Sequence, residues 1–374
     1  MTTEENAGIL YSRVSTQPQR VLNVLKGGDE MELSERKQKI LGAVVEQYIK
    51  TGEPVGSKAL LSALDMSVSS ATVRNEMAEL SALGYLEQPH TSAGRIPTNE
   101  GYRYYVDNLM VDRQIDDNIR RRIEAGISTA LSDPEKLLKK AGEVLADLTD
   151  CAVVSTTPSG EGAFIKRVEA VPVGVHTVMI VLLTSTGVLK SRVCRSDFDL
   201  NAAVLERFYN VVKSSFIGQS LTAVDTPMMQ SLVASLGADF FTLMPLVTAI
   251  SDLAQDAART EIVLGGQSNL LHHSGYYGST AYELLEFLRR GEPLNKMLSG
   301  SGDKEVDVKI GSENPYRQLI KSSVIVSNYN INGAKSGSMG IIGPTRIDYE
   351  TLIPSVRYLT NLVGELLTQT FKDE

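Results

Sequence analysis

Short polar and forked side chains gather in residues 69–75, and their types suit contacts with nucleic acid. Arginine can form two hydrogen bonds to guanine, and asparagine can form two to adenine, so Arg74 and Asn75 are candidate base readers. Hydroxyl groups at the start of a helix can hold a phosphate, and three are present here: Ser69, Ser70 and Thr72. The alternatives are a solvated surface pair for the two longer side chains and simple helix capping for Ser69.

A second polar group follows in residues 90–95, around a glycine. From such a loop His90, Thr91 and Arg95 could reach a minor groove or a phosphate. The alternative is that these side chains hydrogen-bond their own turn. Lys58, upstream of both groups, is a further candidate for a phosphate contact.

The surrounding pattern predicts a helix-turn-helix that would position these groups. The apolar face expected to pack on a small core consists of Val73, Met77, Leu80 and Leu83. A longer amphipathic helix is predicted over residues 34–50, and a short helix capped by Ser57 over residues 58–64. Helix, short helix, turn and recognition helix is the order of the helix-turn-helix motif.

The residues after the recognition helix predict the winged form of this motif. Residues 85–88 and 96–97 are typical of two short strands, with residues 90–95 as the tip between them. Thr98 then caps a helix that is expected to run to residue 110.

Further along, the chain alternates between helical and strand patterns, which predicts an α+β class with several domains. Residues 111–150 are expected to be a helical connector with a new start at Pro134. Strands are predicted at residues 164–173, 176–184, 188–194, 262–264, 306–310, 322–330 and 335–342. Helices are predicted within residues 199–260 and over residues 280–298 and 349–371. A flexible loop is predicted at residues 299–303, between the helix at 280–298 and the strand at 306–310.

The sequence argues against an enzyme, so no catalytic residue, metal or cofactor is expected. The four histidines lack the spacing of metal ligands, and no nucleotide-binding fingerprint is present. Residues 266–270, GQSNL, lack the second glycine of a nucleophile elbow, although His272 and His273 lie nearby. The two cysteines are not paired at short spacing and no apolar run has the length of a membrane span, so a cytoplasmic protein with no membrane contact is expected.

The charge balance is unusual for a chain with a predicted DNA-binding motif. The formal net charge is -8, and residues 31–110 hold eight Lys and Arg against ten Asp and Glu. A positive surface must therefore come from the arrangement of charges, with Glu76 and Glu79 expected to be internal salt partners or to face away from DNA. Nonspecific affinity for DNA should be modest, because it scales with the number of neutralised phosphates.

Residues 31–374 resemble the HrcA family of bacterial heat-inducible transcription repressors. Four separated stretches carry the resemblance: SSATVRNEM (69–77), QPHTSAGR (88–95), GGQSNL (265–270) and GIIGPTR (340–346). The resemblance implies an N-terminal winged helix-turn-helix followed by a GAF-like domain that an inserted dimerising domain interrupts. It also implies a homodimer on a double-stranded inverted-repeat operator of the GroE and DnaK chaperone operons, kept active by the GroE chaperonin.

These expectations divide the chain into five parts. Residues 1–30 would be an extension, either a disordered tail or an upstream misreading of a gene whose translation starts at Met31. Residues 31–110 would bind DNA, 111–150 connect, 151–198 with 261–374 form the GAF-like domain, and 199–260 form the inserted helical dimerisation domain. Two alternatives stay open: a transcription regulator whose GAF-like domain senses a small metabolite, and a hydrolase.

Overall fold

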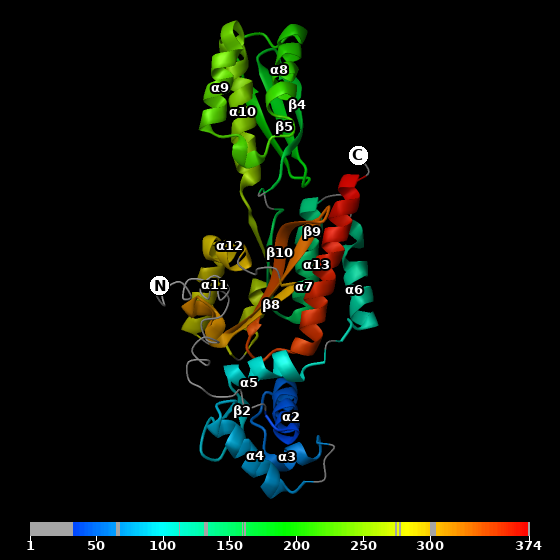
Figure 1. Ribbon diagram of the computed structural model, residues 1–374, viewed down its shortest axis with the longest axis vertical. Helices are drawn as coiled ribbons and strands as arrows, with labels where there is room; N and C mark the ends of the chain where they lie inside the picture. The colour runs from blue at the N-terminus through cyan, green and yellow to red at the C-terminus, as the bar shows by residue number, and fades with distance from the viewer. Residues whose placement is uncertain are drawn as a thin grey trace, which may run out of the picture. The chain divides into compact units, whose positions relative to one another are not determined.

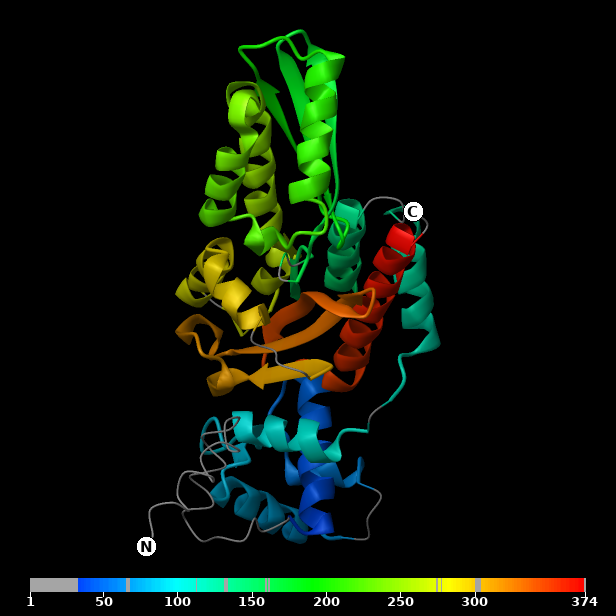
Figure 2. The same ribbon diagram turned by 45° about the horizontal axis from the view of Figure 1, so that its top comes forward.

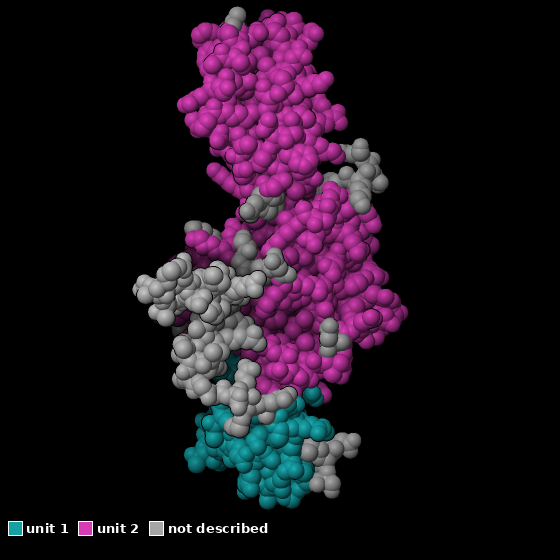
Figure 3. All heavy atoms as spheres, viewed as in Figure 1, with its two compact units in different colours: residues 1–48, 53–101 teal, residues 49–52, 102–374 magenta. Residues whose placement is uncertain are grey.

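The computed structural model describes residues 33–64, 68–111, 113–130, 134–158, 160, 162–273, 275–276, 278–299 and 304–372. The extension predicted at residues 1–30 and most of the loop predicted at 299–303 lie outside these residues. The chain forms two compact units, coloured separately in Figure 3. Unit 1 comprises the described residues up to Tyr48 together with Glu53–Gly101, and unit 2 comprises Ile49–Gly52 and the chain from Tyr102 onward.

Unit 1 is a winged helix-turn-helix, as predicted (Figure 1). Its elements are α2 (Glu35–Thr51, whose last residues belong to unit 2), α3 (Ser57–Leu61), α4 (Ser70–Ala82), β1 (Leu86–Glu87), β2 (Ile96–Pro97) and the start of α5 (Asn99–Tyr104). The two strands of the wing are antiparallel, with Leu86 opposite Pro97. Thr98 caps α5 as predicted, because its Oγ1 accepts a hydrogen bond of 3.0 Å from the Gly101 backbone N–H.

The apolar face of α4 packs into the core of unit 1, with one exception. Val73, Met77 and Leu80 are buried, as are Ile40 and its neighbours on α2. Leu83 was predicted to be the fourth residue of this buried face, and that prediction is wrong, since 48% of its surface is exposed. Leu83 is the C-cap of α4 and is followed by Gly84 at φ +87°, so the chain has already left the helical path at this point.

The short second helix differs from its predicted limits. It was expected over residues 58–64 with Ser57 as its cap, but it begins at Ser57, ends at Leu61, and has Gly56 in the N-cap position. Ser57 is buried, and its Oγ lies 3.2 Å from the Oγ of Ser70 at the start of α4. The hydroxyl therefore joins two helices instead of capping its own.

Unit 2 is built on a five-stranded antiparallel sheet with the strand order β7-β3-β10-β9-β8. The strands are β3 (Ala152–Thr156), β7 (Ile262–Gly265), β8 (Val306–Ile310), β9 (Ser322–Ile331) and β10 (Ala334–Pro344). The helices around it are α6 (Asp117–Ile127), α7 (Pro134–Thr149), α11 (Ser279–Arg289), α12 (Glu292–Ser299) and α13 (Tyr349–Lys372), and a π-helical turn, Tyr105–Leu109, continues α5. Helices α7 and α13 pack on one face of the sheet, and α11 and α12 lie on the other (Figure 2).

The helix predicted over residues 280–298 is in fact two helices, α11 and α12. Gly291 separates them at φ +68°, a left-handed conformation that ends a helix at little cost for glycine. The sequence-based prediction of one helix was wrong because the apolar periodicity continues across this break.

A second α+β lobe is inserted between β3 and β7, which are direct neighbours in the sheet. It contains β4 (Ile165–Gly174), β5 (Thr177–Thr184), β6 (Leu189–Arg195), α8 (Ala202–Ser215), α9 (Thr226–Leu236) and α10 (Phe240–Ala258). Side chains from its three-stranded sheet and from its helices share one hydrophobic core, including Ile180, Phe208 and Leu246. This corrects the predicted helical insertion that began at residue 199, because that boundary cuts through a single core.

In the part of the chain that the structure describes, no helix combines the length and apolar content needed to cross a membrane. The same residues contain no group of three His, Cys, Asp or Glu side chains that could hold a metal ion.

Candidate nucleic-acid interface

The outer face of α4 presents the predicted base-reading residues to solvent. Arg74 and Asn75 are exposed, and Ala78 extends the same surface one turn later. Ser70 and Thr72 are half-buried at the start of the helix. The packing that buries Val73 and Met77 turns this polar face outward, as the helical spacing predicts.

The hydroxyl groups at the start of α4 are engaged within the protein. Ser69 Oγ accepts a 3.1 Å hydrogen bond from the Thr72 backbone N–H and lies 2.9 Å from Thr72 Oγ1. Of the two roles left open for Ser69, capping is therefore the one seen in the structure. The residue remains exposed, so its oxygen is also accessible from outside.

Ser69→Ala should lower the free energy of unfolding of the protein by about 1 kcal/mol, because an N-cap hydroxyl that is lost leaves a backbone N–H of the first turn without its acceptor. Thermal unfolding followed by circular dichroism measures the change. Ser69→Asp is the matched control, since aspartate caps equally well and should keep the midpoint. Equal loss in both variants would contradict the capping role.

The acidic residues of α4 are neutralised by the first helix. Lys37 Nζ lies 2.8 Å from a carboxylate oxygen of Glu79 and 3.1 Å from one of Glu76, and Arg36 also reaches Glu76, at 3.4 Å. Hydrogen bonds from Lys37 to Glu79 and Glu76 raise the pKa of this lysine above its ordinary value. Of the two expectations for these glutamates, salt pairing within the protein is the one seen in the structure.

Three basic side chains in unit 1 are left without such a partner. Lys58, Arg74 and Arg95 form no ion pair with any carboxylate among the residues that the structure describes. Lys58 is exposed on α3 and Arg74 is exposed on α4. Internal pairing of Glu76 and Glu79 thus leaves Arg74 as the unpaired charge on the outer face of α4, although the segment as a whole is slightly acidic.

The wing is held in one shape by its own hydrogen bonds. Gln88 Nε2 donates to the backbone carbonyls of Thr91 and Ala93, both at 2.9 Å. His90 Nδ1 and Ser92 Oγ lie 3.3 Å apart, so the alternative of bonding within the turn applies to His90. Sequence reasoning missed Gln88, whose only signal was its place at the end of the first wing strand.

The base of the wing is joined to the turn before α3. The backbone N–H groups of Val55 and Arg95 each donate to the carbonyl of the other residue, at 2.9 Å. A Cβ atom on Gly94 would lie 2.3 Å from the Val55 carbonyl oxygen, so only glycine permits this approach. The backbone of Arg95 is consequently fixed relative to α3.

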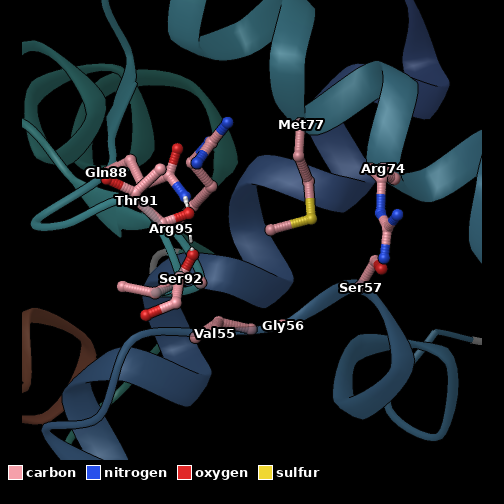
Figure 4. A pocket seen from close by; sticks show the side chains of 11 residues that line it. Val55, Gly56, Ser57, Arg74, Met77, Gln88, Thr91, Ser92 and Arg95 are labelled. Carbon is pink, nitrogen blue, oxygen red and sulfur yellow. Dashed lines mark hydrogen bonds between the residues drawn. The ribbon is translucent and has the colours of Figure 1, made fainter.

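A hollow of about 350 Å³ lies between α4 and the wing (Figure 4). Arg74 stands on one side and Arg95 on the other, with Met77 between them. The structure therefore brings together Arg74, Thr91 and Arg95 of the predicted DNA-binding residues. The other predicted positions do not line the hollow: Lys58, Ser69, Ser70, Thr72, Asn75 and His90.

Two family models match the chain, one over the winged helix-turn-helix and the next helix, and one over most of unit 2. Residues 32–108 match the "Winged helix-turn-helix transcription repressor, HrcA DNA-binding" model, and residues 135–353 match the "HrcA protein C terminal domain" model. The chain belongs to the HrcA family. The resemblance seen in four separated stretches of sequence is thereby confirmed.

Relatives and a solved structure support this membership along nearly the whole chain. The heat-inducible transcription repressor HrcA of Thermoanaerobacter sp. (strain X514) is 35% identical over 350 residues, which is 92% of this chain and 100% of the relative. The protein of the same name from Caldanaerobacter subterraneus subsp. tengcongensis is also 35% identical, with the same coverage. A crystal structure of a hypothetical protein at 2.2 Å resolution is similar with a TM-score of 0.64 and 27% identity, covering 91% of this chain and 100% of that one.

Proposed function

We propose that this chain is a sequence-specific, DNA-binding repressor of heat-shock genes that acts without chemistry, by occupying an operator. The observation that carries the proposal is the outer face of α4, where Arg74 and Asn75 are exposed while the acidic residues of the same helix are paired with α2. Membership of a family whose members are named heat-inducible transcription repressors supports the same function.

The proposed partners follow from the resemblance to the family. The operator is an inverted repeat in double-stranded DNA at chaperone genes of the GroE and DnaK type, and the GroE chaperonin helps to keep the repressor active. Arg74 and Asn75 read bases, and Lys58 and Arg95 bind phosphates. Ser69, Ser70, Thr72, His90 and Thr91 complete the proposed DNA contacts.

We further propose a homodimer through the inserted lobe. The outer face of its three-stranded sheet carries exposed apolar side chains on two edge strands, among them Val171 (41% exposed), Val173 (57%), Leu189 (62%) and Val193 (63%). The half-buried Met179 lies between Val171 and Val193 in the register of the sheet. Contiguous exposed apolar surface usually marks association, and a second copy related by two-fold symmetry matches an inverted repeat.

The helices of the lobe are a poorer candidate for this interface than the sequence indicated. Residues 199–260 were predicted to form a helical dimerisation domain, but their apolar side chains Leu232, Leu243, Leu246 and Val247 are all buried in the core of the lobe. The sheet is therefore the better-supported dimerising face within an inserted domain.

A metabolite-sensing role for the main sheet of unit 2, proposed to be GAF-like, is less well supported. The face of the sheet toward α11 and α12 is filled by side chains of those helices, including Leu284, Phe287 and Met297. These side chains pack against Val324, Val326 and Ile342 of the strands. We accordingly favour the repressor over the ligand-sensing regulator.

Footprinting of the full chain upstream of its own organism's chaperonin genes, with and without purified chaperonin, tests the function. We expect one protected region with two-fold symmetry, and protection at lower protein concentration when chaperonin is present. Protection that instead depends on a small-molecule extract would favour the sensing alternative, and no protection at any chaperone gene would exclude the proposal.

Lys58→Ala should weaken binding to every DNA sequence by the same factor. A phosphate contact releases about one counterion, so the slope of log affinity against log salt should fall by about one unit in magnitude. Binding titrations at several salt concentrations, on the operator and on unrelated DNA, measure both effects. A loss confined to the operator would assign Lys58 to base reading.

A further inference from the structure

The walls of the hollow between α4 and the wing suit an anion. Its lining includes two arginines, Arg74 and Arg95, and no acidic residue (Figure 4). Hydroxyl groups of Ser57, Thr91 and Ser92 add polar atoms to the same walls. The volume of about 350 Å³ is at the lower end of the range of ligand sites, which is enough for a phosphate group with part of a sugar.

The backbone of Arg95 is held in place, and one donor of its side chain lacks an acceptor. Its backbone is fixed by two hydrogen bonds to Val55, so only the side chain can move. Within the side chain, Nε is buried and has no hydrogen-bond partner among the described residues. A buried donor without a partner is costly, and a shift of the side chain toward an acceptor in the hollow would remove that cost.

The wall that carries Arg95 is rigid before any ligand arrives. Gln88 closes the wing turn through its two bonds to backbone carbonyls. Gly94 permits the wing to approach Val55 more closely than any other residue would. A site whose walls are already ordered binds its ligand with a smaller entropic cost.

We propose that this hollow binds one phosphodiester group of the operator backbone, with Arg95 as the donor and Arg74 adding positive charge from the opposite wall. This inference rests on the proposed DNA-binding function. In B-form DNA one backbone strand separates the major groove from the adjacent minor groove. A protein that places α4 in one groove and the wing in the other must straddle that strand, and the hollow is the space between those two elements.

The test uses the full chain and operator duplexes that each carry one neutral methylphosphonate linkage. At one linkage per half-site, the substitution should weaken the wild-type protein about tenfold, because it removes a charge-assisted hydrogen bond. Arg95→Ala should bind that duplex and the native one with affinities within about twofold of each other. Lys58→Ala is the matched control and should keep the tenfold loss at the same linkage.

The outcomes separate this inference from the function on which it rests. If Arg95→Ala keeps the wild-type sensitivity at every linkage, the phosphodiester site is excluded although operator binding stands. If the wild-type chain binds no native operator, the proposed function itself fails. Arg95→Lys keeps the charge but loses Nε, so the methylphosphonate should weaken its binding less than it weakens the wild-type protein. This variant replaces Arg95→Ala in the test if the alanine variant binds too weakly to measure. Saturable binding of inorganic phosphate that Arg95→Ala abolishes, without any linkage effect, would assign the hollow to a free anion and overturn the proposal.

Discussion

Arg74→Ala is expected to lower the affinity of the protein for its operator by roughly 1–3 kcal/mol and to relax the choice of base at one position in each half-site. The side chain is exposed on the outer face of α4 and has no carboxylate partner among the described residues, so it is available to a guanine edge. Removing it should leave the fold unchanged, because the buried residues of α4 are on the opposite face.

Binding to a set of operators, each with one base pair changed, measures the effect on specificity. Wild-type protein should discriminate at the position that Arg74 reads, and the alanine variant should not. Lys58→Ala is the control, since a phosphate contact lowers all affinities equally. If Arg74→Ala binds all these operators with wild-type discrimination, Arg74 does not read a base.

Val193→Asp should convert the proposed dimer into monomers. Val193 is 63% exposed on the edge strand β6, beside Met179 on the outer face of the sheet, so the change costs little in the isolated chain. In a symmetric dimer it would bury two unpaired carboxylates, and such charges are strongly destabilising. We expect the dissociation constant of the dimer to rise at least about a hundredfold, which is roughly 3 kcal/mol.

Sedimentation velocity gives the oligomeric state, and binding to full and half operators gives its consequence. Affinity for the inverted repeat should fall steeply, because a monomer cannot bind both half-sites at once. Affinity for a single half-site should stay unchanged. Phe241→Asp is the matched control, since this residue is 73% exposed on α10, in the helical layer of the lobe. A dimeric Val193→Asp protein, or a monomeric Phe241→Asp protein, would place the interface elsewhere.

Phe240, the neighbour of this control residue, would not test the interface. The sequence places it in an apolar helical block that had been expected to dimerise, but in the structure it packs against the core of the lobe. A charge at this position would report on folding of the lobe. Periodicity alone cannot distinguish the two outcomes, because core and interface select the same residue types.

Local pattern was sufficient to predict the elements of unit 1 and most of those in unit 2. The spacing of Val73, Met77 and Leu80 identifies α4 and its polar face, because helical periodicity depends only on neighbouring residues. Thr98 was expected to cap a helix for the same reason, and capping was one of the two roles left open for Ser69; both residues do cap helices. Two of the predictions that failed were at Leu83 and Gly291, where a break in backbone conformation interrupts an apolar pattern that continues along the chain.

The sequence by itself determined the class of the protein and the exposed polar face of α4, because both depend on short motifs and local spacing. Only the tertiary structure decided how an acidic domain presents a basic face, since Glu76 and Glu79 meet Arg36 and Lys37 across about forty residues of chain. It also decided that Arg74 and Arg95 flank one hollow. These pairings arise where separate elements pack, and the spacing of residues along a chain does not show which surfaces will meet.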